Sequence, residues 1–534
     1  MSRDGIARNA AVVGVMTMIS RVGGLIREVL MAHFFGAGLA KSAFDVAYRI
    51  PNLFRRLFGE GALSAALVPI YAEVTASDGK READRLASAV AGITVALLSA
   101  ITVLGILATY AIARWLPLEE RWLEIMPLLR IMLPYAPLIC LAALVMGVLN
   151  SLKSFAIPSL APAFQNLCCI LVLLLVCPFL PAEGDIRIKV VSWSILLSGA
   201  VQVAVQLPVL RKHGVPLSLA IPLPPPAAVR RVFLLTIPMA LSAGLIQVNV
   251  CLDSLLAMKA GEWGPSVLGY ADRIVYLPLA IIATAFSTVL LPTLSSLSAK
   301  SDWTSFSDSF ARSMRGMVVA MMPASLGIIA LARPIIVLIY QSGAFDDRST
   351  SRTAAALIAY SAGLVAAGAH KIVVTAYYAR KDGKTPVTVG TAGVFLNLAM
   401  NLFFIWVLPP ELKPVGIAIA TAISSTLAVG VLLTILARRS EEGVALFSFS
   451  GLRRVTLAAT AASAAMALFC RAISGTVLRA CAGWSGAAAP KTAALAALCA
   501  AIPLGAALYL ALMRLLCPAA LRELIGDLRA RKRR

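Results

Sequence analysis

Residues 10–38 read AAVVGVMTMISRVGGLIREVLMAHFFGAG, which is long and apolar enough to cross a bilayer yet contains two arginines. The next apolar stretch, AYRIPNLFRRLFGEGALSAALVPIYA (residues 47–72), contains three more arginines and a glutamate. An arginine in the middle of a membrane span costs about 2.5–3.5 kcal/mol on insertion scales, so such residues usually line a polar cavity or pathway. Several arginines in neighbouring helices predict a cationic cavity within the membrane, and therefore an anionic cargo.

The composition of the whole chain is that of a membrane protein. Of its 534 residues, 60% are hydrophobic and 14% are charged, with a mean hydropathy of +0.86, whereas a soluble domain has about 45–50% apolar and about 25% charged residues. The pattern predicts an all-α polytopic fold of about 14 spans. They lie near residues 9–33, 44–73, 88–113, 126–149, 160–180, 188–209, 229–257, 265–297, 314–338, 354–378, 387–408, 414–436, 454–474 and 492–516.

The net charge of +22 does not indicate a nucleic-acid partner, because the basic residues are scattered among short loops and form no single stripe. The excess of Lys and Arg in alternate loops follows the positive-inside rule and places both termini in the cytoplasm.

Motifs for metal binding or enzymatic chemistry are missing from the sequence. The nine cysteines show no C-x-x-C spacing, and the three histidines are far apart. The sequence GKT at 383–385 resembles part of a phosphate-binding loop, but position 378 holds Tyr378 where that motif needs glycine. We therefore expect no enzyme and no ATP site. Transport would be driven by an ion gradient, the membrane potential or cargo supply.

An internal repeat divides the chain. Arg49 aligns with Arg273 and Pro69 with Pro292, while LNSLKSFAIP (residues 149–158) matches YYARKDGKTP (residues 377–386). The repeat spans six helices, so both halves share one orientation, as in transporters with parallel repeats and a site between the halves. The predicted parts are an N-lobe (1–213), a Pro-rich cytoplasmic linker (214–227), a C-lobe (228–437), and two further helices with a basic cytoplasmic tail (438–534).

Guanidinium groups bind phosphate and pyrophosphate through two parallel hydrogen bonds, so buried arginines are the predicted substrate-binding residues. Alternatively, they extend to lipid headgroups or pair with acids such as Glu28, Glu60 and Asp272. Anchoring at the membrane interface suits Arg49 and Arg56. The predicted cavity residues are Arg21, Arg27, Arg55 and Arg273, with supporting or gating roles for Ser20, Arg49, Glu60 and Asp272.

One further polar group lies in an apolar span. Asn249 and Asp253 are one helical turn apart and could bind a coupling cation, Na⁺ or H⁺, or could form a buried hydrogen-bonded pair.

The stretches MTMISRVGGLIREVLMAHFFGAG (16–38) and AYRIPNLFRRLFGEGALSAALVPIYAE (47–73) resemble the start of the MurJ (MviN) family of bacterial lipid II flippases, within the multidrug/oligosaccharidyl-lipid/polysaccharide exporter superfamily. YADRIVYLP (270–278), VLLPTLS (289–295) and YYARKDGKTPV (377–387) resemble further motifs of that family. Together with the 14 predicted spans, these motifs extend the resemblance over nearly the whole chain.

The resemblance implies two six-helix lobes around a cationic cavity, two C-terminal helices that form a groove for a lipid tail, and alternating access. The cargo would be lipid II, the undecaprenyl-pyrophosphate-linked precursor of peptidoglycan, moved from the cytoplasmic to the periplasmic leaflet of the bacterial inner membrane. This activity would serve cell-wall biogenesis and cell shape. Expected partners are lipid II, membrane lipids and other cell-wall synthesis proteins. The family's cavity arginines map onto Arg21, Arg27, Arg55 and Arg273, and its helix-2 glutamate onto Glu60.

One departure concerns the loop before the second helix, where some members carry an aspartate and this chain has Ser42. Asp45 lies three residues further on, and the sequence leaves open whether it takes over. Three other functions also remain open: a flippase for a different polyprenyl-linked glycan, a cation-coupled drug antiporter, and a non-transporting scaffold with a degenerate cavity. The excess of arginine argues against the antiporter, and the intact set of arginines argues against the scaffold.

Overall fold

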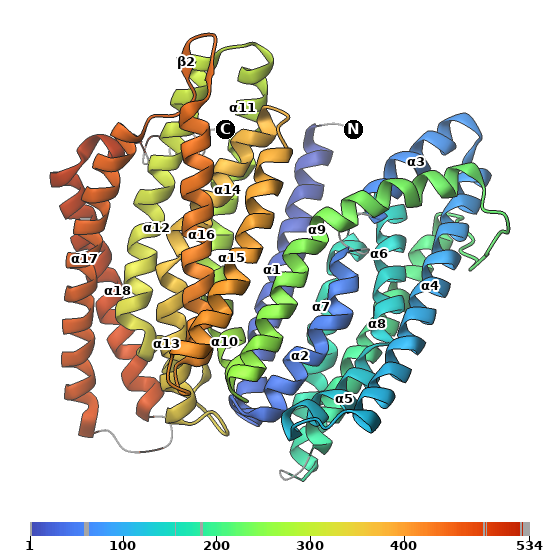
Figure 1. Cartoon of the computed structure of the whole chain (residues 1–534), viewed down its shortest axis with the longest axis horizontal. Helices are drawn as coiled ribbons and strands as arrows, with labels where there is room; N and C mark the ends of the chain where they lie inside the picture. The colour runs from blue at the N-terminus through green and yellow to red at the C-terminus, as the bar shows by residue number, and fades with distance from the viewer. Residues whose placement is uncertain are drawn as a thin grey trace. The chain divides into compact units, whose positions relative to one another are not determined.

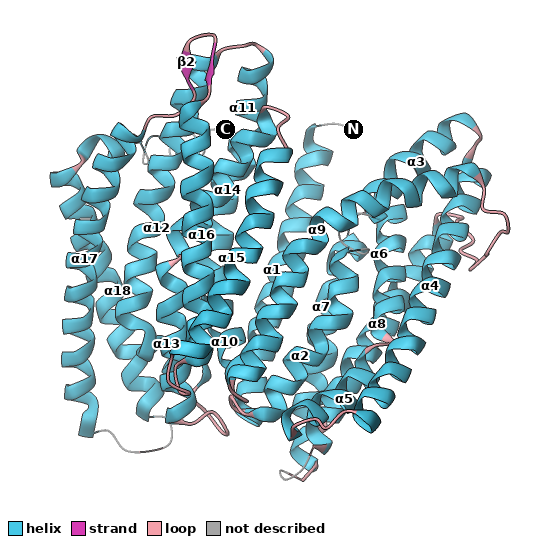
Figure 2. Ribbon diagram, in the orientation of Figure 1, coloured by secondary structure: helices cyan, strands magenta, loops and turns pink. Residues whose placement is uncertain are grey.

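The computed structural model describes residues 3–57, 63–154, 156–181, 185–483, 486, 489–523 and 526, and most of them lie in helices (Figures 1 and 2). The chain divides into two compact units, Met1–Ser266 and Val267–Arg534. Among the described residues, the only strands form a short antiparallel hairpin, β1 (Ser440–Glu441) and β2 (Val444–Ala445). The predicted all-α class is confirmed.

Several helices of the first unit pack against helices that are distant in the sequence. α1 lies against α7, α2 against α5 and α9, and α6 against α8. Its elements are α1 (Arg3–Phe35), α2 (Leu39–Phe54), α3 (Leu63–Ser77), α4 (Lys80–Trp115), α5 (Glu120–Met132), α6 (Tyr135–Ser151), α7 (Ala156–Leu175), η2 (Cys177–Phe179), α8 (Ile186–Lys212) and α9 (Ala227–Ala260).

The second unit is organised around the long helix α12, which packs against α13, α14, α17 and α18. Figure 1 shows α17 and α18 side by side. The elements are α10 (Gly264–Pro278, which begins in the first unit), η3 (Leu279–Ala283), α11 (Thr284–Ala299), α12 (Trp303–Tyr340), α13 (Asp347–Ala362), α14 (Leu364–Ala379), α15 (Lys384–Val407), α16 (Lys413–Arg438), α17 (Phe449–Ala480), η4 (Cys481–Gly483) and α18 (Ala489–Leu516).

Each stretch that the sequence predicts to span the membrane contains helix. Within the described residues, 10 helices are long and apolar enough to cross a membrane, and the pair α5 and α6, bent by 42°, makes an eleventh if it is one span. The chain is therefore a multi-pass membrane protein, and the number of 14 spans stays a prediction.

The backbone repeats the internal symmetry seen in the sequence. Residues 55–57, which follow α2, form a wide π-helical turn, and η3 forms the same kind of turn after α10. A lysine in the left-handed conformation lies two residues beyond the end of both α6 and α14, Lys153 with φ 62° and Lys381 with φ 60°. Because π-helical turns are rare and often mark functional sites, their occurrence at matching places supports the parallel repeat.

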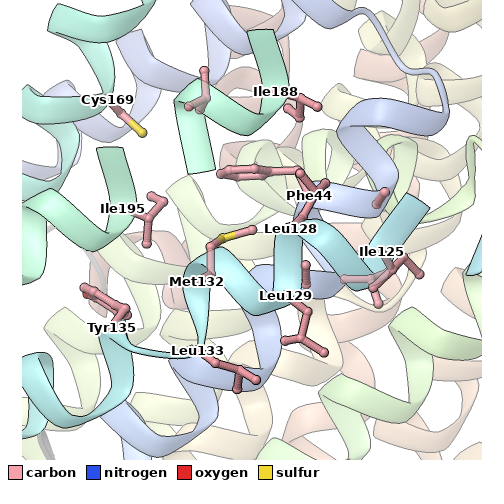
Figure 3. Packing of buried hydrophobic residues seen from close by; sticks show 14 of the residues in the cluster. Phe44, Ile125, Leu128, Leu129, Met132, Leu133, Tyr135, Cys169, Ile188 and Ile195 are labelled. Carbon is pink, nitrogen blue, oxygen red and sulfur yellow. The ribbon is translucent and has the colours of Figure 1, made fainter. Parts of the chain in front are cut away.

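The core of the first unit holds α2 in place. Phe44 from α2 belongs to one buried cluster that also contains Leu128 and Met132 from α5, Tyr135 from the start of α6, and Ile195 from α8 (Figure 3). Each of these side chains is at most 7% exposed. Since burial contributes roughly 25 cal/mol per Å² of apolar surface, this cluster fixes the helix that leads to Arg55.

In the loop that contains GKT, side chains of the protein form hydrogen bonds with one another. The carboxylate of Asp382 accepts hydrogen bonds from the backbone N–H and hydroxyl of Thr385 and from Arg439, at 3.0, 2.7 and 2.6 Å. Burial alone would raise the pKa of Asp382, but these bonds lower it to about 2. Asp382 is therefore ionised at neutral pH and ties the start of α15 to the end of α16.

The predicted Pro-rich linker runs against α4. The hydroxyl of Ser88 donates to the carbonyl of Pro216 at 3.2 Å and accepts from the N–H of Ser218 at 3.3 Å. One turn further along α4, the ideal Cβ of any residue replacing Gly92 would lie 2.2 Å from the carbonyl oxygen of Ala220. The linker therefore packs against α4 only because position 92 carries no side chain.

We expect Gly92→Ala to lower the thermal unfolding midpoint of the purified protein in detergent. The new methyl group must push backbone aside, and overpacking of this kind costs roughly 1–3 kcal/mol. Gly430→Ala on α16 is the matched control, because nothing lies within 4 Å of its added Cβ. That control should keep or slightly raise the midpoint, since alanine favours helix over glycine. Equal midpoints for the two variants would contradict the close contact.

Candidate functional site

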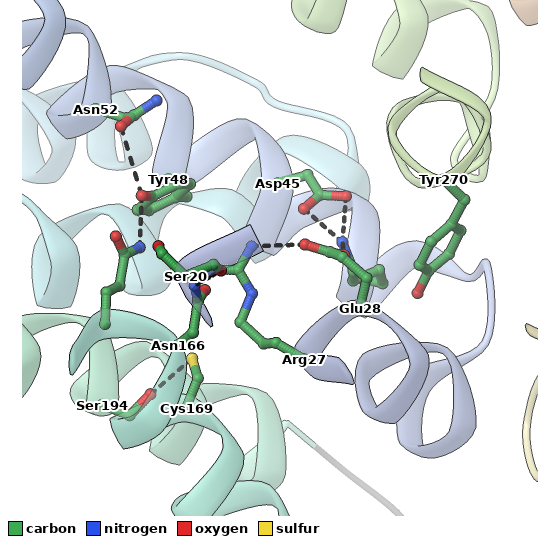
Figure 4. Close-up of polar contacts among 12 residues, drawn as sticks. Ser20, Arg27, Glu28, Asp45, Tyr48, Asn52, Asn166, Cys169, Ser194 and Tyr270 are labelled. Atoms are coloured by element: carbon green, nitrogen blue, oxygen red, sulfur yellow. Dashed lines mark hydrogen bonds and ion pairs between the residues drawn. The ribbon is translucent and has the colours of Figure 1, made fainter. Parts of the chain in front are cut away.

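Arg55 lies at the start of the π-helical turn that follows α2, and a chain of polar side chains supports it. Its Nε donates to Oδ1 of Asn52 at 2.8 Å, and the same oxygen lies 3.5 Å from the hydroxyl of Tyr48. The hydroxyl of Tyr48 accepts from Nε2 of Gln165 at 2.5 Å, and Tyr135 donates to Oε1 of Gln165 at 3.4 Å. Three helices, α2, α6 and α7, thereby position this guanidinium group, and Figure 4 shows Tyr48 bonded to Asn52.

Arg27 is buried on α1 and already has an acidic partner. Its Nη2 lies 2.6 Å from Oε1 of Glu28, and the two side chains are 11% and 9% exposed. Neighbouring residues on a helix do not face each other, so the long arginine side chain must bend along α1 to make this contact. The pairing with Glu28 that the sequence left open is therefore present in this structure.

Lys41 is a second cation beside the Arg27–Glu28 pair. The sequence analysis did not identify it. Lys41 is 2% exposed, and its Nζ lies 2.6 Å from both carboxylate oxygens of Asp45 and 3.5 Å from Oε2 of Glu28. Figure 4 shows Asp45 beside the Arg27–Glu28 pair. Lys41 was missed because it lies between two predicted spans, where a lysine is usually exposed. Its spacing of four residues from Asp45 was the available signal.

Ser42, in the first turn of α2, makes its contact through its hydroxyl. The Ser42 hydroxyl donates to Oγ of Ser266 at 3.0 Å and accepts from the Ser266 N–H at 3.3 Å. Both serines are fully buried. Asp45 is engaged by Lys41, so Ser42 itself joins α2 to the first turn of α10.

Arg21 differs from Arg27 and Arg55 in its surroundings. Its side chain is exposed, and within the described part of the chain it has no hydrogen-bond or ion-pair partner. The preceding carbonyl, that of Ser20, accepts a hydrogen bond from Asn166 at 2.9 Å. Gly23 and Gly24 face the same asparagine, at 3.4 and 3.6 Å from an ideal Cβ. This contact fixes α1 against α7.

Two further arginines of this region make structural contacts. Arg49 donates to the carbonyl of Val250 at 3.4 Å, and Arg56 donates to Oε1 of Gln247 at 3.0 Å. Both partners lie on α9, so these two arginines join α2 and the adjoining turn to α9.

The fourth predicted arginine belongs to the second unit. Arg273 and Asp272 lie on α10, where Arg273 is exposed and Asp272 is partly buried. A lysine within a predicted span, Lys371 on α14, reaches Oγ1 of Thr284 at 3.4 Å, directly after the π-helical turn. The sequence analysis did not single out this cation. Glu60, assigned a gating role from the sequence, lies outside the described residues.

The possible cation site lies on α9. Nδ2 of Asn249 donates to Oδ2 of Asp253 at 3.4 Å on α9. Across the described residues, no group of three or more His, Cys, Asp and Glu side chains is arranged to hold a metal ion.

Comparisons with known proteins agree with this architecture. The family model described as "Lipid II flippase MurJ" matches residues 31–486. The chain is 33% identical to the probable lipid II flippase MurJ of Vibrio cholerae, over 79% of this chain and 81% of that protein. It is 32% identical to the lipid II flippase MurJ of Burkholderia cenocepacia, over 77% and 80% of the two proteins.

Solved structures show the same fold. The inward closed conformation of lipid II flippase MurJ superposes with a TM-score of 0.74 and 24% sequence identity, covering 95% of this chain and 98% of that chain. An inward-facing multidrug resistance transporter of the MATE family follows with a TM-score of 0.64 and 16% identity, covering 84% and 98%. Both identities are low, so these two matches support the fold.

We expect Gln165→Leu to reduce transport and to destabilise the first unit. The change removes the hydrogen bond that Tyr135 donates to Gln165 and the one that Gln165 donates to Tyr48, and each lost hydrogen bond costs about 0.5–1.5 kcal/mol. Thermal unfolding and a transport assay on the purified protein measure the two effects. Gln202→Leu is the control, because the Gln202 side chain bonds only to a carbonyl within its own helix, at 3.2 Å from Ser198. Similar transport by the two variants would argue against the supporting role of Gln165.

Proposed function

We propose a transport mechanism for this chain, which belongs to the lipid II flippase MurJ family: it carries lipid II across the membrane through a central cationic cavity by alternating access. The observation that supports it best is the pair of supported arginines in the first unit, Arg27 and Arg55. A pyrophosphate offers several acceptor oxygens to guanidinium forks, and a membrane interior strengthens such charge-assisted hydrogen bonds. The protein is thus a transporter and not an enzyme.

The cargo enters from the cytoplasm in this proposal. We infer from the basic loops that both termini lie in the cytoplasm, and we propose that the protein lies in the bacterial inner membrane. The pyrophosphate headgroup binds Arg21, Arg27, Arg55 and Arg273 while the cavity faces the cytoplasm. The N-lobe (1–213) and the C-lobe (228–437), joined by the linker 214–227, then rock so that the cavity opens to the periplasm.

The polyprenyl tail of the cargo stays in the lipid phase. We assign the groove that holds it to α17 and α18, which lie within the C-terminal part at 438–534 and pack against each other and against α12. Membrane lipids and other cell-wall synthesis proteins are the further partners of this proposal.

We assign two candidate energy sources, one from the side chains of α9 and one from the charge of the headgroup. Asn249 and Asp253 are the candidate site for a coupling cation, Na⁺ or H⁺, because a carboxylate and an amide oxygen on one helix turn suit a hard cation. The membrane potential is the other candidate, since a multiply charged headgroup moves across the membrane field. Asp272 and Glu60 would balance the charge of the cavity arginines between transport cycles.

We expect Arg21→Ala and Arg273→Ala to reduce lipid II transport strongly while both variants still insert into the membrane. A charge-assisted hydrogen bond contributes about 1.5–3 kcal/mol, so each loss should cut flipping roughly ten- to hundredfold. The test depletes the wild-type protein in its host and adds an external enzyme that cleaves only outward-facing lipid II. Arg333→Ala is the control, because Arg333 pairs with Asp347 at an exposed site.

Cleavable lipid II should collapse while total lipid II rises, and wild-type protein and Arg333→Ala should restore it. Restoration by Arg21→Ala or Arg273→Ala as sole copy would overturn the role of these arginines. If depletion leaves the cleavable lipid II unchanged and another polyprenyl-linked glycan accumulates instead, the cargo assignment is wrong.

A further inference from the structure

A cleft of about 270 Å³ lies beside α12 and is lined, among the described residues, by Asp308, Arg312 and Arg315. The three residues are spaced i, i+4 and i+7, so they share one face of the helix. The cleft has room for a group larger than one water molecule, whose share of liquid volume is about 30 Å³. None of the three residues takes part in the proposed transport mechanism.

The charged groups at this cleft are two acids and two bases. Asp308 and Arg312 are exposed, and among the described residues neither side chain makes an ion pair or a hydrogen bond. Arg315 donates from Nε and Nη2 to the carboxylate of Glu523 at 3.2 to 3.3 Å. Its third nitrogen, Nη1, has no acceptor in the described part of the chain. The cleft therefore presents one carboxylate and the donors of two guanidinium groups.

These charges have a definite order along α12, which is long and apolar enough to cross a membrane. Residues 316–332 contain no charged side chain and rise about 25 Å as a helix, close to the hydrocarbon thickness of about 30 Å. Arg315 and Arg333 flank this stretch, so both lie near the edges of the hydrocarbon. Arg312 lies about 4.5 Å further out than Arg315, and Asp308 about 10 Å further out. The guanidinium groups are therefore at the level of the lipid phosphates, and the carboxylate is nearer the water.

The headgroup of phosphatidylethanolamine has its charges in the matching order. Its phosphate lies next to the glycerol and acyl chains, and its ammonium group lies further out. Guanidinium groups bind phosphate through parallel hydrogen bonds, and an ammonium group offers three donors to a carboxylate. An anionic headgroup without a cation would satisfy Arg312 but would place a second negative charge beside Asp308.

We propose that this cleft binds the headgroup of phosphatidylethanolamine, with Arg312 and Arg315 on the phosphate and Asp308 on the ammonium group. Glu523 is a positioning residue, because it holds one edge of the Arg315 guanidinium group and leaves Nη1 for the phosphate. The bound lipid would link α12 to the segment that follows α18. This inference needs only that α12 spans the membrane, and it does not depend on which glycolipid the protein carries.

The test measures lipid affinity on purified, delipidated protein by native mass spectrometry. The probes are phosphatidylethanolamine, phosphatidylcholine and phosphatidylglycerol with the same acyl chains. We expect the wild-type protein to bind phosphatidylethanolamine about fivefold more tightly than either of the other two lipids. The quaternary ammonium group of phosphatidylcholine has no N–H donor for Asp308, and phosphatidylglycerol has no cation.

An exchange of the two unpaired charges tests their order without changing the net charge. In the double variant Asp308→Arg, Arg312→Asp, the affinity for phosphatidylethanolamine should fall about fivefold, to that for phosphatidylcholine. The matched control is Glu82→Arg, Arg85→Glu, which exchanges an exposed ion pair on α4 and also keeps the net charge. This control should bind phosphatidylethanolamine as the wild-type protein does.

The single variant Asp308→Asn is read through a ratio of affinities, because the positive charge that it adds favours every anionic lipid. The ratio of the affinity for phosphatidylethanolamine to that for phosphatidylglycerol should fall about fivefold. Thermal unfolding identifies any misfolded variant. If the double variant at positions 308 and 312 is misfolded, Asp308→Asn decides the outcome.

The inference is overturned if the wild-type protein binds phosphatidylethanolamine and phosphatidylcholine equally, or if the folded exchange variant keeps the wild-type affinity. An unchanged ratio in Asp308→Asn, or an equal loss of affinity in the control on α4, also overturns it. Soluble phosphoethanolamine has the same headgroup chemistry without acyl chains. Displacement of the lipid by an equal concentration of this compound would show that the cleft takes a free headgroup compound and not a membrane lipid.

Discussion

A charged side chain inside a membrane protein needs a partner, and much of the structure around the candidate site follows from that constraint. Arg27 is held by Glu28, and Lys41 by Asp45. Arg55 is held by an amide oxygen of Asn52. An acidic partner must be displaced before an anion can take the same donor of the cation.

The polar chain behind Arg55 shows how the fold stabilises such a residue. Tyr135 is fully buried and Gln165 nearly so, and each donates to the next member of the chain toward Tyr48. Buried polar networks rigidify a core when each member is satisfied, because an unsatisfied group is costly in a low-dielectric interior. The π-helical turn at 55–57 then sets where the guanidinium group emerges from the helix.

The contact at Ser42 is made between neutral groups. A hydroxyl pair joins α2 to the start of α10, and the acid nearby, Asp45, is occupied by Lys41. A neutral hydrogen bond contributes about half as much as a charge-assisted one. In this chain, the contact between Ser42 and Ser266 is therefore expected to open more easily than one made by a carboxylate.

The sequence by itself determined the membrane class, the repeat and the arginines, because apolar periodicity and buried charge are local properties of the chain. It also named Glu28 as a partner for a cavity arginine, since acids within a span are rare. Only the tertiary structure decided that Lys41 is buried between Glu28 and Asp45, that Lys371 reaches Thr284, and that Gln165 supports the chain leading to Arg55. These contacts join different helices, and the register between helices is set by side-chain packing that no local pattern encodes.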